Sequence, residues 1–293
     1  MASPVLYLGV DGGATRCRGR LRDASGAVLA EAEGPAANAY VGFDTAVAVV
    51  RDVIARCLSD MKDTTCVSLG LGLAGISSPA DSARFAAALP GFADVRVAND
   101  ATTACLGAHA GADGGLLIAG TGSAGIARVA GREAIISGRG FLLGDDGSAA
   151  RVGANALRAA LRAHDGLQPH SALTRDIMAH FGDDPVAMTR WALTARPGDY
   201  GAFAPRVLEA AARGDVVALP IVEAATRAIG ALAAAITALG AARIAMVGGL
   251  GAAIRPYLPP ELNAQLREPL FDPTDGAVLL AGGKLPDVGK PAP

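Results

Sequence analysis

The chain has 293 residues, of which 51% are hydrophobic, 4% aromatic and 18% charged. This length and apolar content provide for one large or two ordinary domains with filled cores, and they exclude a disordered chain. The 26 basic and 28 acidic side chains nearly balance, for a formal net charge of −2, so neither nucleic acid nor an anionic membrane is expected as a partner.

Cysteine and histidine spacing indicates neither a zinc ribbon nor a disulfide framework. The four cysteines lack CxxC spacing and the four histidines form no HExxH pattern. We expect no signal peptide, because residues 1–4 lead straight into the first apolar run without a charged n-region and an apolar h-region. The longest nearly apolar stretch, residues 228–242, falls short of the roughly 20 residues that a membrane span needs. We expect a cytoplasmic protein with reduced thiols and a buried core helix over this stretch.

The stretch from Val5 to Arg22 predicts two strands joined by an acidic, glycine-rich corner. Gly12 and Gly13 would turn the backbone with positive φ and let an anion reach the N–H groups. Thr15 would add a hydroxyl donor, and Asp11 could hold a metal ion. The alternative is an ordinary glycine-containing hairpin, because glycine pairs mark turns generally.

The second strand of this hairpin carries a row of arginines on one face: Arg16, Arg18, Arg20 and Arg22. A solvated strand face is the favoured interpretation of this row, ahead of phosphate binding. A third strand over residues 27–32 completes an antiparallel meander, and Asn38 follows in a polar loop. The spacing of apolar residues then predicts a helix from Phe43 to Asp60.

Residues 66–73 predict a central parallel strand that runs into the glycines 70, 72 and 75. Their G-x-G-x-x-G spacing is not a dinucleotide fingerprint, because no helix starts on the third glycine. Instead Ser78 and Pro79 predict a helix N-cap and first turn. Residues 95–98 form the next strand, which ends at Asn99 and Asp100 before a helix over residues 101–110. Asp100 is either the N-cap or a functional carboxylate at a strand end.

Residues 116–134 repeat the opening pattern: apolar strand LLIAG, corner GTGSAG and strand IARVA. The glycines 120, 122 and 125 again show G-x-G-x-x-G spacing, but residues 126–130 alternate as a strand where a Rossmann unit has a helix. Thr121 and Ser123 place hydroxyls beside the flexible backbone. Two such corners facing each other would hold a polyphosphate from both sides.

A loop over residues 138–147 precedes a helix from Ser148, and Asp145 and Asp146 either cap this helix or bind polar substrate groups. The following chain is predicted to be helical, with helices over residues 177–181, 185–195, 205–213 and 220–239 and a loop at RPGDYGAF. A strand over 243–247 then reaches Gly248 to Gly251, a third glycine corner suited to a flat adenine or ribose. A short strand near 266–270, a turn at Asp272-Pro273 and a helix over 275–282 complete the chain.

Five motifs in this order resemble one kinase family: VDGGATR, NDATTACLGAH, AGTGSAG, GDDGSAA and MVGGLG. They are similar to the N-acetylglucosamine kinases of the BadF/BadG/BcrA/BcrD ATPase group, in the actin-like ATPase superfamily. HDGLQPH and DYGAFAP further resemble the bacterial glucosamine kinase branch. The resemblance spans almost the whole chain.

The resemblance implies an α/β, ribonuclease H-like fold with two duplicated domains, each a mixed five-stranded sheet flanked by helices. The nucleotide would lie in the cleft between them. The first domain would cover residues 1–108 and a helix over about 275–285. The second would cover 109–274, with a helical insertion over about 148–240.

The same resemblance implies ATP-dependent phosphorylation of the 6-hydroxyl of N-acetylglucosamine or glucosamine, with Mg²⁺ and often as a homodimer. Asp11 would hold Mg²⁺ through water, and Asp100 would be the catalytic base. The first phosphate loop would contain Gly12, Gly13 and Thr15, and the second Gly120, Thr121, Gly122 and Ser123. Gly248 and Gly249 would lie beside adenosine. The sugar site would be lined by Asn38, Asp100, Gly138, Arg139, Gly140 and Asp145.

General chemistry agrees with this set, since phosphoryl transfer needs held phosphates and a carboxylate that accepts the hydroxyl proton. Two positions depart from the family pattern. Arg139 stands where the animal N-acetylglucosamine kinases have tryptophan, and Asp146 where glutamate is common. Either change could alter what fits around the 2-amino or 2-acetamido group, so the reaction is better determined than the substrate.

Other functions fit less well. A BadF/BcrA-type iron–sulfur ATPase activator needs cysteines in the middle of the chain, and none follows Cys105. A non-catalytic sugar-sensing repressor would carry a helix-turn-helix segment and often a CxCGxxGC zinc motif, and neither occurs. A chaperone-like nucleotide switch would need a peptide-binding domain, for which no residues remain.

Overall fold

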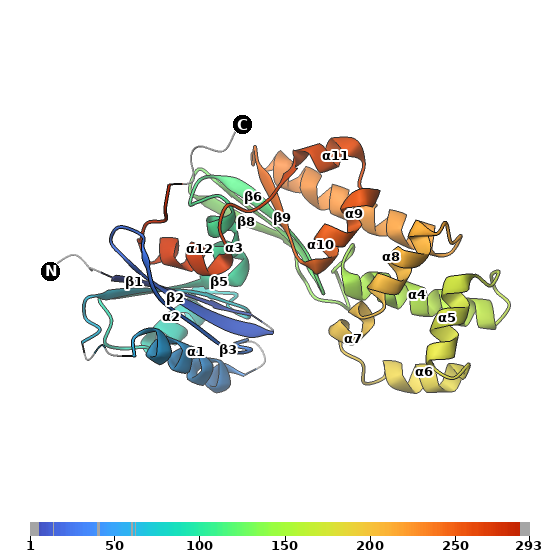
Figure 1. Ribbon diagram of the computed structural model, residues 1–293, viewed down its shortest axis with the longest axis horizontal. Coiled ribbons are helices and arrows are strands. Elements are labelled where there is room, and N and C mark those ends of the chain that lie inside the picture. Colours follow the sequence, from blue (N-terminus) through green and yellow to red (C-terminus); the bar gives the residue numbers. More distant parts are fainter. Residues whose placement is uncertain (1–5, 14, 40–41, 60, 62, 288–293) are drawn as a thin grey trace. The chain divides into compact units, whose positions relative to one another are not determined.

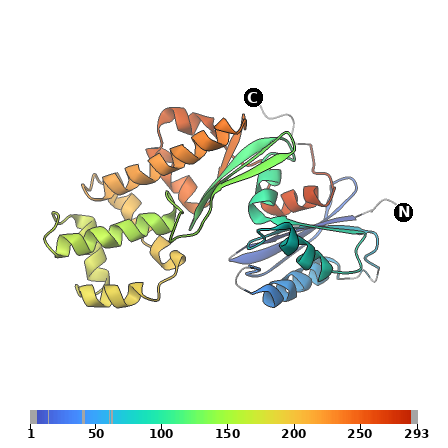
Figure 2. The ribbon, with the colours of Figure 1, turned by 180° about the vertical axis from the view of Figure 1, so that it is seen from behind.

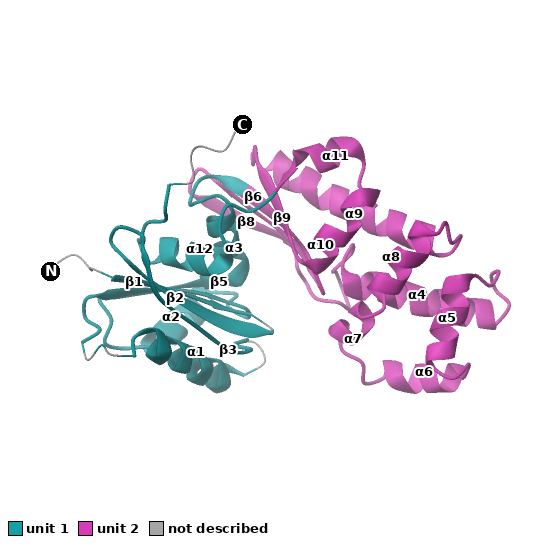
Figure 3. Ribbon diagram, in the orientation of Figure 1, with its two compact units in different colours: residues 1–114, 268–293 teal, residues 115–267 magenta. Residues whose placement is uncertain are grey.

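The computed structural model describes residues 6–13, 15–39, 42–59, 61 and 63–287. They form two compact units, one of residues 1–114 with 268–293 and one of residues 115–267 (Figure 3). These boundaries differ by six or seven residues from the predicted 108/109 and 274/275. Val5 and Asp60, the ends of a predicted strand and a predicted helix, lie outside the described residues.

The first unit is an α/β unit drawn from both ends of the chain. Its elements in chain order are β1 (Leu6–Gly12), β2 (Arg16–Asp23), β3 (Val28–Pro35), α1 (Phe43–Cys57), β4 (Val67–Leu73), α2 (Pro79–Ala87), β5 (Asp94–Asn99), α3 (Asp100–Ala108) and α12 (Pro273–Leu280).

The sheet of this unit has the strand order β3-β2-β1-β4-β5. The meander β1-β2-β3 is antiparallel, whereas β1, β4 and β5 run parallel. Both views show α1 on one face of the sheet and α12 on the other (Figures 1 and 2). The amphipathic α1 buries Val47, Val50 and Val53 in the core of the unit.

Close glycine contacts seat α12 directly on the sheet. A Cβ on Gly9 would lie 2.3 Å from the carbonyl oxygen of Thr274, and one on Gly70 would lie 2.0 Å from that of Ala277. Larger residues at these strand positions would push the helix away, so the glycines set the distance between α12 and strands β1 and β4.

Arg18, Arg20 and Arg22 of β2 form ion pairs with Asp272 and Asp275 at the start of this helix, which corrects the expectation of a solvated face for these three, whereas Arg16 is exposed as expected. Arg20 forms ion pairs with Asp272 at 3.0 Å and Asp275 at 2.7 Å, and Arg22 contacts Asp275 at 2.8 Å. The alternation showed that the arginines share one face, but the acidic partners are about 250 residues away in the sequence.

The second unit repeats the sheet and adds a large helical insertion. Its elements are β6 (Gly114–Ala119), β7 (Ser123–Val129), β8 (Arg132–Ser137), α4 (Ala149–His164), α5 (Ala172–His180), α6 (Pro185–Ala192), α7 (Pro197–Gly201), α8 (Ala204–Ala212), α9 (Ala218–Ala238), β9 (Ile244–Val247), α10 (Gly249–Ile254), the 3₁₀ helix η1 (Arg255–Tyr257), α11 (Pro260–Gln265) and β10 (Leu266–Arg267).

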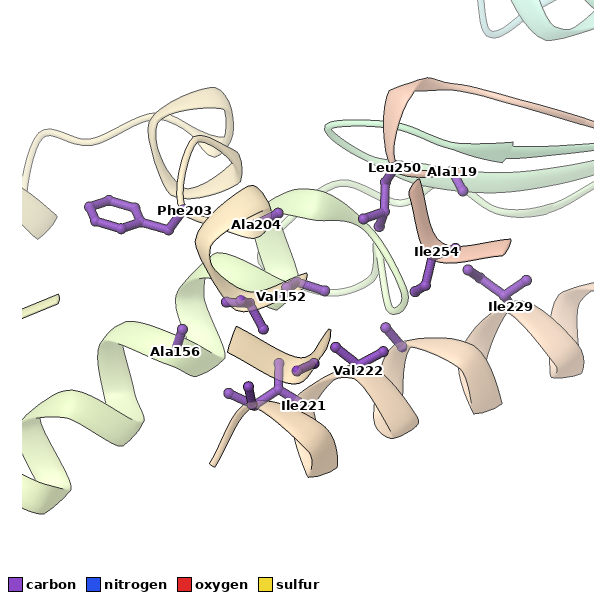
Figure 4. Packing of buried hydrophobic residues seen from close by; sticks show 14 of the residues in the cluster. Ala119, Val152, Ala156, Phe203, Ala204, Ile221, Val222, Ile229, Leu250 and Ile254 are labelled. Atoms are coloured by element: carbon purple, nitrogen blue, oxygen red, sulfur yellow. The ribbon is translucent and has the colours of Figure 1, made fainter. Parts of the chain in front are cut away.

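The second sheet has the order β10-β9-β6-β7-β8, which matches the first sheet with β6, β7 and β8 in the places of β1, β2 and β3. β9 runs parallel to β6 and β10, and β7 pairs antiparallel with β8. The predicted fold of two mixed five-stranded sheets flanked by helices is confirmed. Figure 4 shows how apolar residues of α4, α8, α9 and α10 pack together in this unit, among them Val152, Ala204, Val222 and Leu250.

Helix α9 is longer than the apolar stretch that the sequence indicated. It has 21 residues, and among the described helices it alone is long and apolar enough to cross a membrane. The argument from length was therefore wrong. Its burial pattern is that of a core helix, because Ile221, Val222, Ile229 and Ile236 pack into the hydrophobic core.

Three short elements also differ from the prediction. RPGDYGAF contains the helix α7 rather than a loop, Asp272 is the N-cap of α12 rather than part of a free turn, and the last strand has only two residues. Elements this short show no hydrophobic period, so their turn-forming residues were the only signal. The predicted cap at Ser78 is confirmed, because its side chain accepts a hydrogen bond from the N–H of Asp81.

Candidate active site

The carboxyl ends of β1, β4 and β5 bring the predicted residues of the first unit to one edge of the sheet. The N–H of Ala74, just after β4, donates to the carbonyl of Gly12 at 2.8 Å. Asn38 is half-buried and forms an isolated parallel bridge with Ala74. Asp100 follows β5 directly. In parallel α/β sheets this edge is where ligands bind.

Asp100 is the first residue of α3 but not its cap. The cap is Asn99, whose Oδ1 accepts from the N–H of Ala101 at 2.9 Å and whose Nδ2 donates to the carbonyl of Ile76 at 2.8 Å. The capping interpretation of Asp100 was therefore wrong. Burial raises the pKa of Asp100, and the negative charge of Asp11 raises it further. A carboxyl in this state is a suitable proton acceptor.

Asp11 is the second-last residue of β1 and pairs with Arg18 of β2. The Nη2 of Arg18 is 3.0 Å from its Oδ2. Burial raises the pKa of Asp11, and the hydrogen bond and charge of Arg18 oppose that rise without cancelling it. The charge of Asp11 thus acts on Asp100, and both carboxyls are half-buried.

The first glycine corner differs from its predicted conformation. Among the described residues, neither Gly12 nor Gly13 has positive φ. Gly12 is instead closely packed, because a Cβ there would lie 2.6 Å from Cδ2 of Leu73 and 3.1 Å from the carbonyl oxygen of Ala37. The N–H of Gly13 donates to the carbonyl of Arg16 at 2.9 Å. Thr15 is exposed, so its hydroxyl is the described polar side chain of this corner that a phosphate could reach.

The second unit joins two of the predicted glycine corners around one pocket. The pocket has a volume of ≈ 310 Å³ and is lined mainly by apolar atoms, with Gly120, Thr121 and Gly249 among the lining residues. The remaining lining residues are Ala149, Gly201, Ala204, Pro205, Leu208, Leu250 and Ala253. Three of the family-like motifs reach these positions: DYGAFAP supplies Gly201, Ala204 and Pro205, GDDGSAA supplies Ala149, and MVGGLG supplies Leu250.

Local contacts fix the shape of this pocket. Gly248 has φ of 104°, and a Cβ there would lie 2.3 Å from the carbonyl oxygen of Ala119, so only glycine fits. The first amides of α4 close the second corner, since the N–H of Ala149 donates to the carbonyl of Gly120 at 2.9 Å. Gly122 is half-buried beside this corner. A flat apolar pocket next to backbone amides suits a nucleotide base followed by phosphates.

The predicted sugar loop lies beside the same corner. Asp145 is buried, and its carboxylate accepts from the N–H of Ser123. The Ser123 hydroxyl donates to the carbonyl of Asp146 at 2.7 Å, so it holds the loop. Gly138, Arg139 and Gly140 are exposed. The N-cap of α4 is Ser148, whose hydroxyl oxygen accepts from the backbone N–H of Arg151. Asp145 and Asp146 therefore do not cap this helix. Burial raises the pKa of Asp145, against the hydrogen bond from Ser123.

These features define the class: an actin-like ATPase fold with two duplicated units and polar loops at the ends of its parallel strands. The chain belongs to the BadF/BadG/BcrA/BcrD ATPase family, whose sequence profile matches residues 8–281. The resemblance inferred from the five motifs is confirmed. Among the described residues, no three histidine, cysteine or acidic side chains converge as a ready metal site.

Three relatives extend the comparison. The chain is 34% identical to the glucosamine kinase GspK of Vibrio cholerae over 280 residues, which cover 94% of this chain and 95% of the relative. It is 28% identical to the N-acetyl-D-glucosamine kinase of Dictyostelium discoideum over 95% of this chain and 98% of that one. A solved structure from Chromobacterium violaceum, described as a candidate N-acetylglucosamine kinase, matches with a TM-score of 0.86 and 34% identity, covering 94% and 98% of the two chains.

Proposed function

We propose that this chain is an ATP-dependent kinase that phosphorylates the 6-hydroxyl of an amino sugar, glucosamine or N-acetylglucosamine. The observation that carries the proposal is Asp100, a half-buried carboxyl of raised pKa at the carboxyl end of β5. It is free to act as a base because Asn99 caps α3 in its place. The names of the relatives support an amino sugar as the acceptor.

The reaction assigns different tasks to the two units. The apolar pocket of the second unit would receive adenine, and the phosphates would lie beside Thr121 and Gly122 of the second corner. Asp100 would accept the proton of the sugar hydroxyl as that oxygen attacks the γ-phosphorus in line, and ADP would leave. Asn38 and Asp145 would select the sugar, since a mismatched epimer would leave a buried polar group unpaired.

Asp11 fits a magnesium ion bound through water. Mg²⁺ usually keeps several waters and needs only one or two carboxylates beside the substrate phosphates. Arg18 engages Oδ2 of Asp11, and the described residues place no hydrogen-bond donor on Oδ1. The ion would neutralise the charge of the phosphates. The chain would work in the cytoplasm, and a homodimer stays a prediction that a mass measurement by light scattering would test.

The test is ADP release with glucosamine, N-acetylglucosamine and glucose, in wild type and Asp100→Asn. We expect an amino sugar to be the best acceptor and the variant to lose about 10²–10⁴-fold in kcat, the range of general-base catalysis. Asn keeps an oxygen for the hydrogen bond from Ala101, so the fold should persist. Full turnover by Asp100→Asn would show that Asp100 is not the catalytic base. Turnover that a Mg²⁺ chelator leaves unchanged would show that the reaction does not need Mg²⁺.

The alternative of an iron–sulfur activator receives no support from the cysteines. All four lie in the first unit as free thiols, and Cys17, Cys57 and Cys105 are buried. Burial raises the pKa of Cys17 to about 12 and that of Cys57 to about 11. Such thiols stay protonated and do not act as metal ligands readily.

A further inference from the structure

The sugar loop between β8 and α4 has a backbone conformation that needs support from contacts outside the loop. Ser137 and Asp145 have φ of 61° and 60°, and Gly138, Gly140 and Gly147 also have positive φ. Left-handed conformations at non-glycine residues persist only where surrounding contacts impose them. Within the loop, the N–H of Gly144 donates to the carbonyl of Gly140 at 2.8 Å, and the N–H of Ser148 donates to the carbonyl of Asp145 at 3.1 Å.

The tip of the loop contributes little packing. Leu142 and Leu143 are 89% and 90% exposed, which is unusual for leucine. The neighbouring ring of Phe141 does pack, with its centroid 5.0 Å from that of Tyr200. The loop therefore has to be held from beneath, by groups that reach its carbonyls.

Arg151, in the first turn of α4, provides this contact. Its Nη2 donates to the carbonyls of both Phe141 and Gly144, the latter at 2.8 Å. Its guanidinium carbon lies 5.0 Å from the centroid of the Phe141 ring, within cation–π range. One charged group thus holds both sides of the exposed tip, and Gly144 directly precedes Asp145.

We infer that Arg151 is a positioning residue for sugar binding, an inference that rests on the proposed function. Asp145 is held from one side by the N–H of Ser123 on its carboxylate and by the N–H of Ser148 on its carbonyl. From the other side it is held by Arg151 through Gly144. Without the guanidinium the Gly138–Gly144 segment samples other conformations, and sugar binding has to select the competent one.

The chain offers a matched control on the same helix. Arg158 lies seven residues after Arg151, is exposed, and lines the same groove of ≈ 480 Å³ between the loop, α4 and α9. No described hydrogen bond joins Arg158 to the loop. Arg158→Met therefore removes an equal charge from the same groove without releasing the loop.

The experiment compares Arg151→Met, Arg151→Lys and Arg158→Met with wild type in two measurements. In steady-state kinetics, Arg151→Met should raise the KM for the amino sugar about tenfold, the factor that corresponds to 1.4 kcal/mol, and leave the KM for ATP within about twofold. Lysine can reach one carbonyl, so Arg151→Lys should recover part of the loss, and Arg158→Met should match wild type.

Hydrogen exchange of the free protein supplies the second measurement. The amides of residues 140–146 should exchange faster in Arg151→Met than in wild type. In Arg158→Met they should exchange at the wild-type rate. Unchanged exchange in Arg151→Met, or faster exchange with an unchanged sugar KM, would overturn the inference. If wild type released no ADP with any sugar, the proposed function and the sugar role of the loop would both fall, while exchange would still decide whether Arg151 holds the loop.

Discussion

Arg22 and Asp275 form a buried ion pair that ties β2 to α12. Arg22 is 6% exposed and Asp275 is 4% exposed, and both Nε and Nη2 of the arginine contact Oδ1 of the aspartate, at 3.0 and 2.8 Å. A buried pair adds little net stability over apolar residues, but loss of one partner leaves the other charge uncompensated. The pair therefore matters most when it is broken.

We expect Asp275→Ala to lower the free energy of unfolding by about 3–5 kcal/mol, because it strands Arg22 in the interior. Asp94→Ala is the control, since its ion pair with Arg96 is half exposed on both sides and should contribute no more than about 1 kcal/mol. Urea denaturation measures the free energy of unfolding of both variants. Equal losses in the two variants would show that the Arg22–Asp275 pair is not decisive.

The three carboxyls of the candidate site determine the acid side of the pH profile. Burial raises the pKa of Asp11, Asp100 and Asp145 above the ordinary 3.8. A base accepts a proton only when ionised, so kcat/KM should fall as the pH drops through these raised values, above pH 3.8. The measurement is kcat/KM against pH, and an acid limb at or below 3.8 would contradict the assigned states.

The sequence located these carboxyls but not what surrounds them. Asp11 and Asp100 follow apolar runs, so their places at strand ends could be predicted from the chain itself. Arg18 was visible only as one member of a repeated row, and Arg151 only as a charge in a helical stretch. Their roles depend on contacts made after folding, Arg18 with Asp11 across the hairpin and Arg151 with the loop carbonyls before α4.

At the scale of elements, helices α3 and α12 cross at unusually short range. A Cβ on Gly276 would lie 1.7 Å from the carbonyl oxygen of Thr103, and a Cβ on Gly107 would lie 2.2 Å from that of Asp272. Two glycines, one on each helix, permit this approach. The atoms nearest to each added Cβ belong to the backbone of the other segment. A larger residue could therefore not be accommodated by rotating a side chain.

Gly276→Ala should therefore destabilise the protein although alanine favours helix. Overpacking costs typically 1–3 kcal/mol, and here backbone would have to move. The matched variant is Gly198→Ala in α7, where nothing lies within 4 Å of an added Cβ. This variant should raise the free energy of unfolding by up to about 1 kcal/mol, because alanine loses less backbone entropy than glycine in a helix. Thermal unfolding of both variants gives the comparison, and a Gly276→Ala protein as stable as wild type would exclude a rigid crossing.

Elements with a clear period were predicted well, whereas those defined by contacts were not. The strands around the glycine corners and the long helices α1, α4 and α9 follow from apolar spacing, and α4 also has a side-chain cap in Ser148. Helix α7 has five residues and is packed on α4, where a Cβ on Gly153 would lie 1.8 Å from the carbonyl of Tyr200. The helix also has local support, from Pro197 in its first turn and from the hydrogen bond that the N–H of Arg196 donates to Oδ2 of Asp199 at 2.6 Å, but turns share these signals.

For the whole molecule, the internal repeat was the most informative sequence feature. The corner at residues 120–125 echoes that at residues 11–15, and each is followed by the second strand of an equivalent sheet. The apolar pocket of the second unit was less accessible to prediction, since its walls come from the corner after β6 and from α4, α7, α8 and α10. Residues such as Leu208 and Ala253 carry no chemical signature in the sequence.

The return of α12 to the first sheet has a consequence for how the chain is made. Residues 115–267 form the second unit without interruption, but the first unit needs the segment from residue 268 onward to cover β1 and β4. A ribosome delivers that segment after the whole second unit, and domains generally fold as units during synthesis. The first unit is therefore completed only after the second unit has emerged, and until then the face of its sheet that carries Gly9 and Gly70 lacks its covering helix.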